Sequence, residues 1–156
     1  MYRTALALTS AALMLTATTA AAQETEPPPG PPPINACGTS LEVEVLKEVF
    51  QRRDTGTGFT TSGTVVLRIS DDDGSVVVRQ SGRFSVRLTE TGATVTNTGR
   101  TLLDNPGLAE AIEEAGLPGL PLIIGRVVIK DNLEGTAPEI VSIRGRVIDV
   151  CELLDR

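Results

Sequence analysis

The strongest constraint on the fold of this chain is a period-two alternation of apolar and polar residues. It is clearest in three segments, 65–70, 83–88 and 141–147, where Val, Ile, Leu or Phe alternates mainly with Arg or Ser. Alternation over five to eight residues is typical of half-buried β-strands, and the chain is rich in the β-branched residues that strands favour. We therefore expect most of the folded region to be strand.

Turn signals separate these segments at short intervals. They lie at Asp72–Ser75, Glu90–Gly92, Asn97–Gly99 and Asn132–Gly135. Closely spaced strands and turns form antiparallel hairpins. The sequence thus predicts an all-β antiparallel meander that closes into a small barrel, with a sandwich as the alternative. We also expect the first half of Leu41–Phe50 to be strand.

One short helix is expected to interrupt the strands. Asp104 or Asn105 can cap it, Pro106 suits its first turn, and Gly116 ends it. So short a helix is unstable alone and has to pack on the sheet. A last helical turn is expected at Cys151–Leu154.

The chain has two cysteines, Cys37 and Cys151, one near each end of the expected domain. In an oxidising compartment we expect them to form a disulfide that joins the two ends. Two free thiols or a redox pair are the alternatives, but no Cys-x-x-Cys motif is present.

The N-terminal segment has the pattern of a secretory signal peptide. Arg3 is its only charge before a long apolar stretch, and Ala20-Ala21-Ala22 provides the small residues of a cleavage site. The sequence predicts a signal peptide at 1–22, a proline-rich linker at 23–36 and a β domain at 37–156. A retained anchor and lipidation at Cys37 are the poorer alternatives. We expect a secreted or extracytoplasmic protein without a stable membrane anchor.

Composition removes several kinds of chemistry. The chain has no His and no Trp, and its single Tyr, Tyr2, lies in the predicted signal peptide. This excludes His-dependent triads and His-ligated metals, and we expect no catalytic residue, metal or cofactor. The net charge of −6 also argues against binding nucleic acid, which requires clustered cations.

Aromatic residues are few after the predicted cleavage site, where only Phe50, Phe59 and Phe84 remain. Sugars and nucleobases are commonly bound by stacking on aromatic rings. The sequence therefore predicts neither polysaccharide nor nucleic-acid binding by stacking.

Two charged features have both a functional and a structural interpretation. Asp71-Asp72-Asp73-Gly74 is either a calcium loop or, preferably, a hairpin turn, since it lacks the spacing of an EF-hand. Several strand arginines either converge on an anion or, preferably, lie on the solvent face and pair with acidic residues across strands. These arginines are Arg68, Arg79, Arg83, Arg87, Arg126, Arg144 and Arg146.

Two glycine-containing segments are also candidates. Thr55–Thr64 lacks the lysine of a phosphate-binding loop, and we expect a flexible loop near an opening. The segment 116–122 contains Leu117, Leu120 and Leu122, which either form a ligand mouth or partner patch or, as the safer interpretation, pack on the core.

Several glycine motifs resemble one family. These are Gly82-Arg83-Phe84, Gly99-Arg100-Thr101, Gly125-Arg126-Val127 and the terminal 145–151, Gly-Arg-Val-Ile-Asp-Val-Cys. Together they resemble uncharacterised small secreted actinobacterial proteins that end in Gly-x-x-x-Asp-x-Cys. The resemblance covers most of 37–154. It implies an exported β domain with paired end cysteines and carries over no catalytic residue.

Two functional hypotheses follow. The first is an exported, non-catalytic binding or surface-interaction module, whose partner is an unknown protein. The second is a β-barrel that carries a small apolar ligand or, less favoured, acts on one through carboxylate and Arg groups. A lipid-like molecule that copurifies with the protein would distinguish the second from the first.

Overall fold

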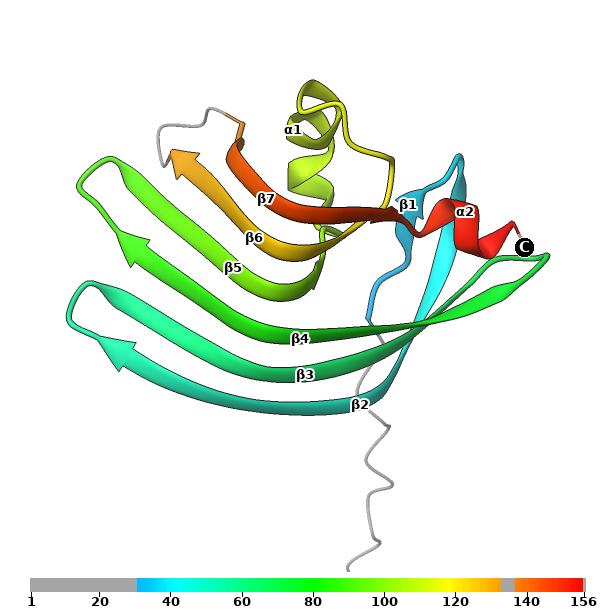
Figure 1. The fold of residues 1–156 in the computed structure, drawn as a ribbon, viewed down its shortest axis with the longest axis horizontal. Helices are drawn as coiled ribbons and strands as arrows, with labels where there is room; N and C mark the ends of the chain where they lie inside the picture. The colour runs from blue at the N-terminus through cyan, green and yellow to red at the C-terminus, as the bar shows by residue number, and fades with distance from the viewer. Residues whose placement is uncertain (1–30, 133–136, 156) are drawn as a thin grey trace, which may run out of the picture.

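A computed structural model describes residues 31–132 and 137–155, so the predicted signal peptide lies outside the described residues. Seven antiparallel strands pair in the order of the chain, which confirms the predicted meander. The sheet curls into a half-barrel rather than a closed barrel (Figure 1). The strands are β1 (Ile34–Ala36), β2 (Thr39–Thr55), β3 (Gly58–Ser70), β4 (Ser75–Leu88), β5 (Gly92–Leu102), β6 (Pro121–Asn132) and β7 (Glu139–Asp149).

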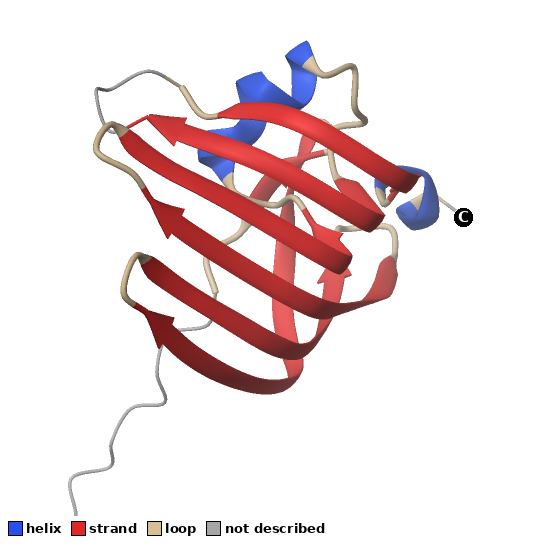
Figure 2. Cartoon of the chain, turned by 60° about the vertical axis from the view of Figure 1, so that its left-hand side comes forward, coloured by secondary structure: helices blue, strands red, loops and turns tan. Residues whose placement is uncertain are grey.

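Three short helical segments accompany the sheet, η1 (Pro106–Leu108), α1 (Ala109–Glu114) and α2 (Cys151–Leu154). The predicted cap is found at Asn105, whose side chain accepts a hydrogen bond from the Gly107 backbone N–H at 2.9 Å. The predicted last turn of helix is also present, as α2. Figure 2 shows the strands in front of α1, which lies on the inner side of the curved sheet.

The structure differs from the sequence-based boundaries at three places. Strand β1 lies within the predicted linker 23–36, so the sheet begins three residues before Cys37. Thr55–Thr64 is not a loop, because only Gly56 and Thr57 separate β2 from β3. Asn97–Gly99 is not a turn but the middle of β5.

A row of glycines explains the last difference and the curvature of the sheet. Five of them lie directly opposite one another on adjacent strands: Gly63, Gly82, Gly99, Gly125 and Gly145. A Cβ atom at Gly82 would lie 2.0 Å from the carbonyl oxygen of Thr98, and one at Gly125 would lie 2.0 Å from that of Arg144. The four from Gly82 onward have φ between +121° and +150°, which L side chains rarely adopt. Glycine within a strand permits a tight bend, and this row bends the sheet across its middle.

The sheet has two hydrophobic cores. The first lies at the end of the molecule that carries β1 and α2, and its centre includes Leu41, Ile69 and Val150. The second lies between helix α1 and the inner side of β5–β7, with Ile112 packing near Ile123 and Val127. Helices α1 and α2 therefore both bury apolar side chains against the sheet.

The predicted disulfide joins Cys37 to Cys151, with the two Cα atoms 5.4 Å apart. Cys37 and Gly38 both have positive φ, 56° and 76°, as in the tight two-residue turns that connect antiparallel strands. Cys151 is the first residue of α2. The bond thus ties the β1–β2 turn to the end of β7, across 114 positions of sequence.

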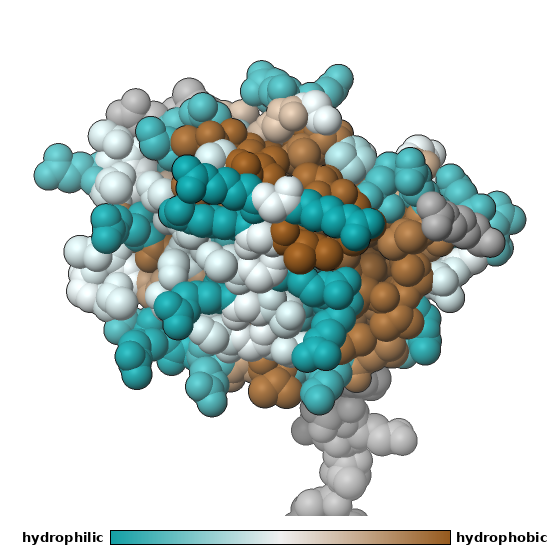
Figure 3. All heavy atoms as spheres, viewed as in Figure 1, coloured by the Kyte–Doolittle hydropathy of each residue, from teal (hydrophilic) through white to brown (hydrophobic). Residues whose placement is uncertain are grey.

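The surface mixes polar and apolar residues. In Figure 3 hydrophobic residues gather at the right, over the end of the molecule that carries α2 and β1. Val45, Leu46 and Val77 are among the exposed large hydrophobic residues of β2 and β4. In the described ranges no helix has the length and apolar character needed to cross a membrane.

Candidate ligand-binding site

A cavity of about 450 Å³ lies on the inner side of the half-barrel, between strands β2–β6 and the segment that leads into η1. Its apolar walls come from Val65, Val95, Leu103, Leu108 and Ile129. Pockets that hold small ligands typically enclose about 300–1,000 Å³ and are lined mainly by apolar side chains. The cavity therefore has the size and the lining of a small-molecule site.

The glycine row provides part of the space. Gly63 and Gly82 both line the cavity, and neither has a side chain to fill it. Phe50, which lies opposite Gly63 on β2, covers that glycine, since a Cβ there would be 2.6 Å from the phenyl Cδ1. An aromatic ring over a strand glycine shields the bare backbone.

Two phenylalanines are exposed where they line the cavity. Phe50 is 50% exposed and Phe84 is 36% exposed. The ring of Phe84 lies 5.9 Å from that of Phe59, and the Arg52 guanidinium lies 3.9 Å from the centre of the Phe59 ring. All three phenylalanines of the chain thus gather on the inner face, and two of them present apolar surface that a ligand can cover.

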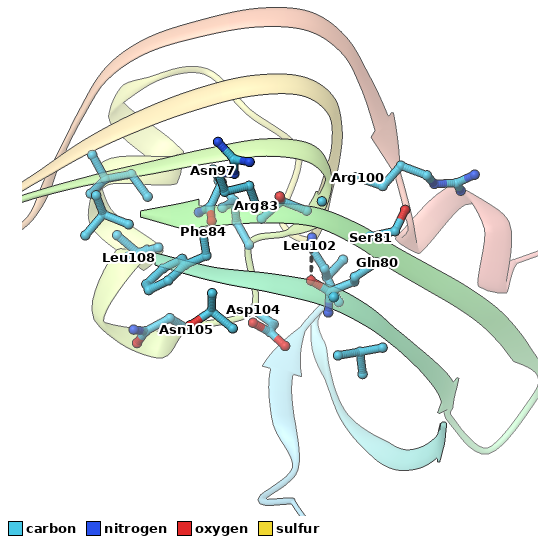
Figure 4. A pocket seen from close by; sticks show the side chains of 18 of the residues that line it. Gln80, Ser81, Arg83, Phe84, Asn97, Arg100, Leu102, Asp104, Asn105 and Leu108 are labelled. Atoms are coloured by element: carbon cyan, nitrogen blue, oxygen red, sulfur yellow. Dashed lines mark hydrogen bonds between the residues drawn. The ribbon is translucent and has the colours of Figure 1, made fainter. Parts of the chain in front are cut away.

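Polar side chains also line the cavity, among them Gln80, Asn97 and Asp104 (Figure 4). The Gln80 Oε1 accepts a hydrogen bond from the Leu102 backbone N–H at 3.1 Å. This bond joins β4 to β5 just beyond Ser81, where their regular pairing ends. Because the oxygen is occupied, the Gln80 amide N–H groups remain as donors.

Asp104 follows β5 and precedes the Asn105 cap. Burial raises the pKa of its carboxyl above the ordinary value, and a hydrogen bond with its own backbone opposes this shift. Asp104 forms no ion pair with any described residue. Burial therefore disfavours the charged form of this carboxyl group, and when protonated it can both donate and accept a hydrogen bond.

The leucines predicted as a ligand mouth lie elsewhere. Leu120 and Leu122 are 1% and 2% exposed in the first core, and Leu117 packs on the second core. None of the three lines the cavity. Packing on the core, the safer interpretation, therefore describes these residues.

The cavity residues were missed from the sequence, although one signal was available. Glycines recur inside alternating segments at 63, 82, 99, 125 and 145, and glycine within a strand marks a bend or a close approach. A bent sheet has a hollow inner side, so the apolar neighbours of these glycines were the residues to examine.

Asp71 and Arg68, two of the other candidates, have structural roles. Asp71 Oδ1 accepts hydrogen bonds from the backbone N–H groups of Asp73 and Gly74, which closes the turn between β3 and β4. Of the predicted strand arginines, Arg68 pairs with Glu44 across β2 and β3. Among residues 31–132 and 137–155, no three His, Cys, Asp or Glu side chains are grouped to hold a metal.

The fold and cavity together define an antiparallel half-barrel with a ligand-sized inner cavity. Comparison of the chain with protein-family models, curated proteins and solved structures finds no match.

Proposed function

We propose that this protein is an exported, non-catalytic binding module that holds a small, largely apolar ligand in its inner cavity. The observation that carries the proposal is the exposure of Phe50 and Phe84 toward a cavity of about 450 Å³. Large apolar side chains in an open hollow lose contact with water when a ligand enters, and this favours binding.

Export is supported by the N-terminal signal pattern and by the disulfide. A Cys37–Cys151 bond persists in an oxidising compartment and is unusual in the cytosol. The resemblance to secreted actinobacterial proteins agrees with this location and remains an expectation.

The polar groups of the cavity suit orientation of a ligand better than catalysis. Gln80 and Asp104 stand in the wall without a histidine, which the chain lacks altogether. We infer a ligand with an apolar body and one hydrogen-bonding group that reaches Gln80 or Asp104.

Two measurements test this proposal. The first is mass spectrometry of an organic extract of the natively purified, full-length protein, in which we expect a copurified lipid-like molecule. The second is titration with N-phenyl-1-naphthylamine, a neutral apolar dye whose fluorescence rises in apolar sites.

Two adjacent residues of β3 provide a matched pair of variants. Thr61 lines the cavity, whereas Ser62 points to the opposite face. We expect Thr61→Phe to fill the cavity and abolish dye binding, and Ser62→Phe to leave it unchanged. A protein that carries no extracted ligand and binds no dye would instead favour the first hypothesis, a module for a macromolecular partner.

A further inference from the structure

Five arginines gather on the outer face of strands β4–β7, and two of them, Arg83 and Arg100, also border the cavity. All are exposed: Arg83, Arg100, Arg126, Arg144 and Arg146, here called the outer arginine cluster. Their neighbours in sequence, such as Phe84, Val127 and Ile143, line the cavity or pack in the second core, so the arginines point outward. In Figure 4 the side chains of Arg83 and Arg100 point away from Phe84 and Asp104.

Members of the cluster are close together. Arg126 lies directly opposite Arg144 on the neighbouring strand. Directly opposed residues of antiparallel strands have Cβ atoms about 4.5–5.5 Å apart, and like charges in that position destabilise a sheet. Arg144 and Arg146 lie on the same face, about 7 Å apart along β7. The fold itself does not require this concentration of positive charge.

No acidic residue of the described chain neutralises the cluster. The only ion pairs among the described residues are Arg52–Asp54 and Arg68–Glu44, and neither includes a member. The arginines lie in two rows of directly paired residues that run across the strands. The other positions of these rows are Ser62, Thr64, Ser81, Thr98 and Ile124, together with β2 residues. A chain with a net charge of −6 thus has two adjacent cross-strand rows that contain these arginines and no acidic residue.

This finding changes the interpretation of the strand arginines. Pairing with acidic residues across strands was expected, and among the predicted residues Arg68 alone shows it. Unpaired guanidinium groups bind phosphate or carboxylate oxygens through two parallel hydrogen bonds, and neighbouring hydroxyl groups add donors.

The shape and composition of the face limit the kind of anion. The face is convex, so a flat bilayer touches only a narrow strip of it, whereas a flexible chain can follow its curve (Figure 2). Phe50, Phe59 and Phe84 all lie on the inner face, which leaves no aromatic ring here to stack on a base. The Cβ atoms of neighbouring arginines lie about 5–7 Å apart, a spacing that suits a chain with closely spaced anionic groups better than one with sparse charges.

We propose that the outer arginine cluster is a docking surface for a flexible, phosphate-bearing chain without nucleobases. Arg126, Arg144 and Arg146 do not line the cavity, so docking at these three arginines does not depend on the ligand proposed there. Docking would hold the exported protein on a polyanion while its inner face stays open.

The test measures binding of the full-length protein to long-chain inorganic polyphosphate by fluorescence anisotropy at several salt concentrations. For four to five contacts, we expect the logarithm of the association constant to fall with that of the salt concentration with a slope of about −3. Orthophosphate at the same phosphate concentration should not compete, because a single anion cannot contact several arginines at once.

Two triple variants with the same change in charge locate the surface. Arg126→Gln/Arg144→Gln/Arg146→Gln should weaken polyphosphate binding by more than about tenfold. The control Lys47→Gln/Arg79→Gln/Lys130→Gln, exposed positions outside the cluster, should lose less than about threefold. The cluster variant removes a repulsion, so its melting temperature should not fall, and misfolding cannot account for its loss.

Several results would overturn the proposal. These are absence of polyphosphate binding at low salt, equal losses in the two variants, or complete competition by orthophosphate. Tighter binding to vesicles of anionic phospholipid would identify a membrane, and not a flexible chain, as the partner of this surface. Equal affinity for oligodeoxythymidine would remove the argument against nucleobases.

Discussion

Gly82 on β4 lies directly opposite Gly99 on β5, and a Cβ atom on Gly82 would be 3.0 Å from the Gly99 Cα. The two backbones approach so closely that neither position accepts a side chain without movement. This pair stands at the centre of the glycine row that bends the sheet and hollows its inner side.

Substitution of Gly82 should therefore be costly. We expect Gly82→Ala to destabilise the protein by about 3 kcal/mol or more, because of both the contact with the Thr98 carbonyl and the φ of +149°. Gly56→Ala is the control, since open space surrounds Gly56, and its effect should stay within about 0.5 kcal/mol. Urea unfolding of both variants measures the difference. Equal stabilities would show that the row does not determine the bend.

The disulfide should contribute strongly to stability. Removing it with Cys37→Ser/Cys151→Ser should cost about 2–5 kcal/mol, since the bond closes a long loop of the unfolded chain. Thermal unfolding in non-reducing buffer tests this. An unchanged melting temperature would contradict the contribution, and reductant should lower the melting temperature of the wild type alone.

The hydrogen bond between Gln80 and the Leu102 backbone should hold β4 and β5 together where their pairing ends. Gln80→Leu leaves the Leu102 N–H without its acceptor and should cost about 1–3 kcal/mol. The exposed Gln51, changed to Leu, is the comparison. Amide hydrogen exchange at Leu102 gives a local readout, and unchanged protection there would refute the role of the bond.

Asp104 should make stability depend on pH. Its pKa is higher in the folded protein than in the unfolded chain, so the folded state binds the proton more tightly. Stability should therefore decline as pH rises from the ordinary value of 3.8 through the raised pKa, and then level off.

Asp104→Asn removes the titrating group and keeps a similar shape. We expect it to abolish this decline and to be more stable than the wild type at neutral pH. Denaturant unfolding between pH 3 and pH 7 compares the two proteins. The same slope in both would show that Asp104 does not titrate differently on folding.

Much of the fold was predictable because the signals are local. Alternation in 83–88 and 141–147 predicted strands, and the helix after Asn105 followed from its cap, its proline and its closing glycine. The disulfide was predictable from two cysteines at the domain ends. Each of these predictions depends only on residues that are close in sequence or on the number of cysteines.

The wrong predictions concern residues whose structural role depends on contacts with residues far away in the sequence. Asn97–Gly99 has the composition of a turn, but Gly99 lies between Gly82 and Gly125 and so belongs to a bent strand. Leu120 and Leu122 were candidates for an exposed patch. They are buried because α2 and β1 come together over them, tied by the disulfide.

The sequence by itself determined most of the strands, their meander order, the short helix and the paired cysteines, because periodicity, turn chemistry and capping act over a few residues. Only the tertiary structure decided that five glycines align, that three phenylalanines share the inner face, and that five arginines gather on the outer one. These groupings arise from the register between strands and the curvature of the sheet. Register is a relation between residues that are far apart in the chain, and no local pattern specifies it.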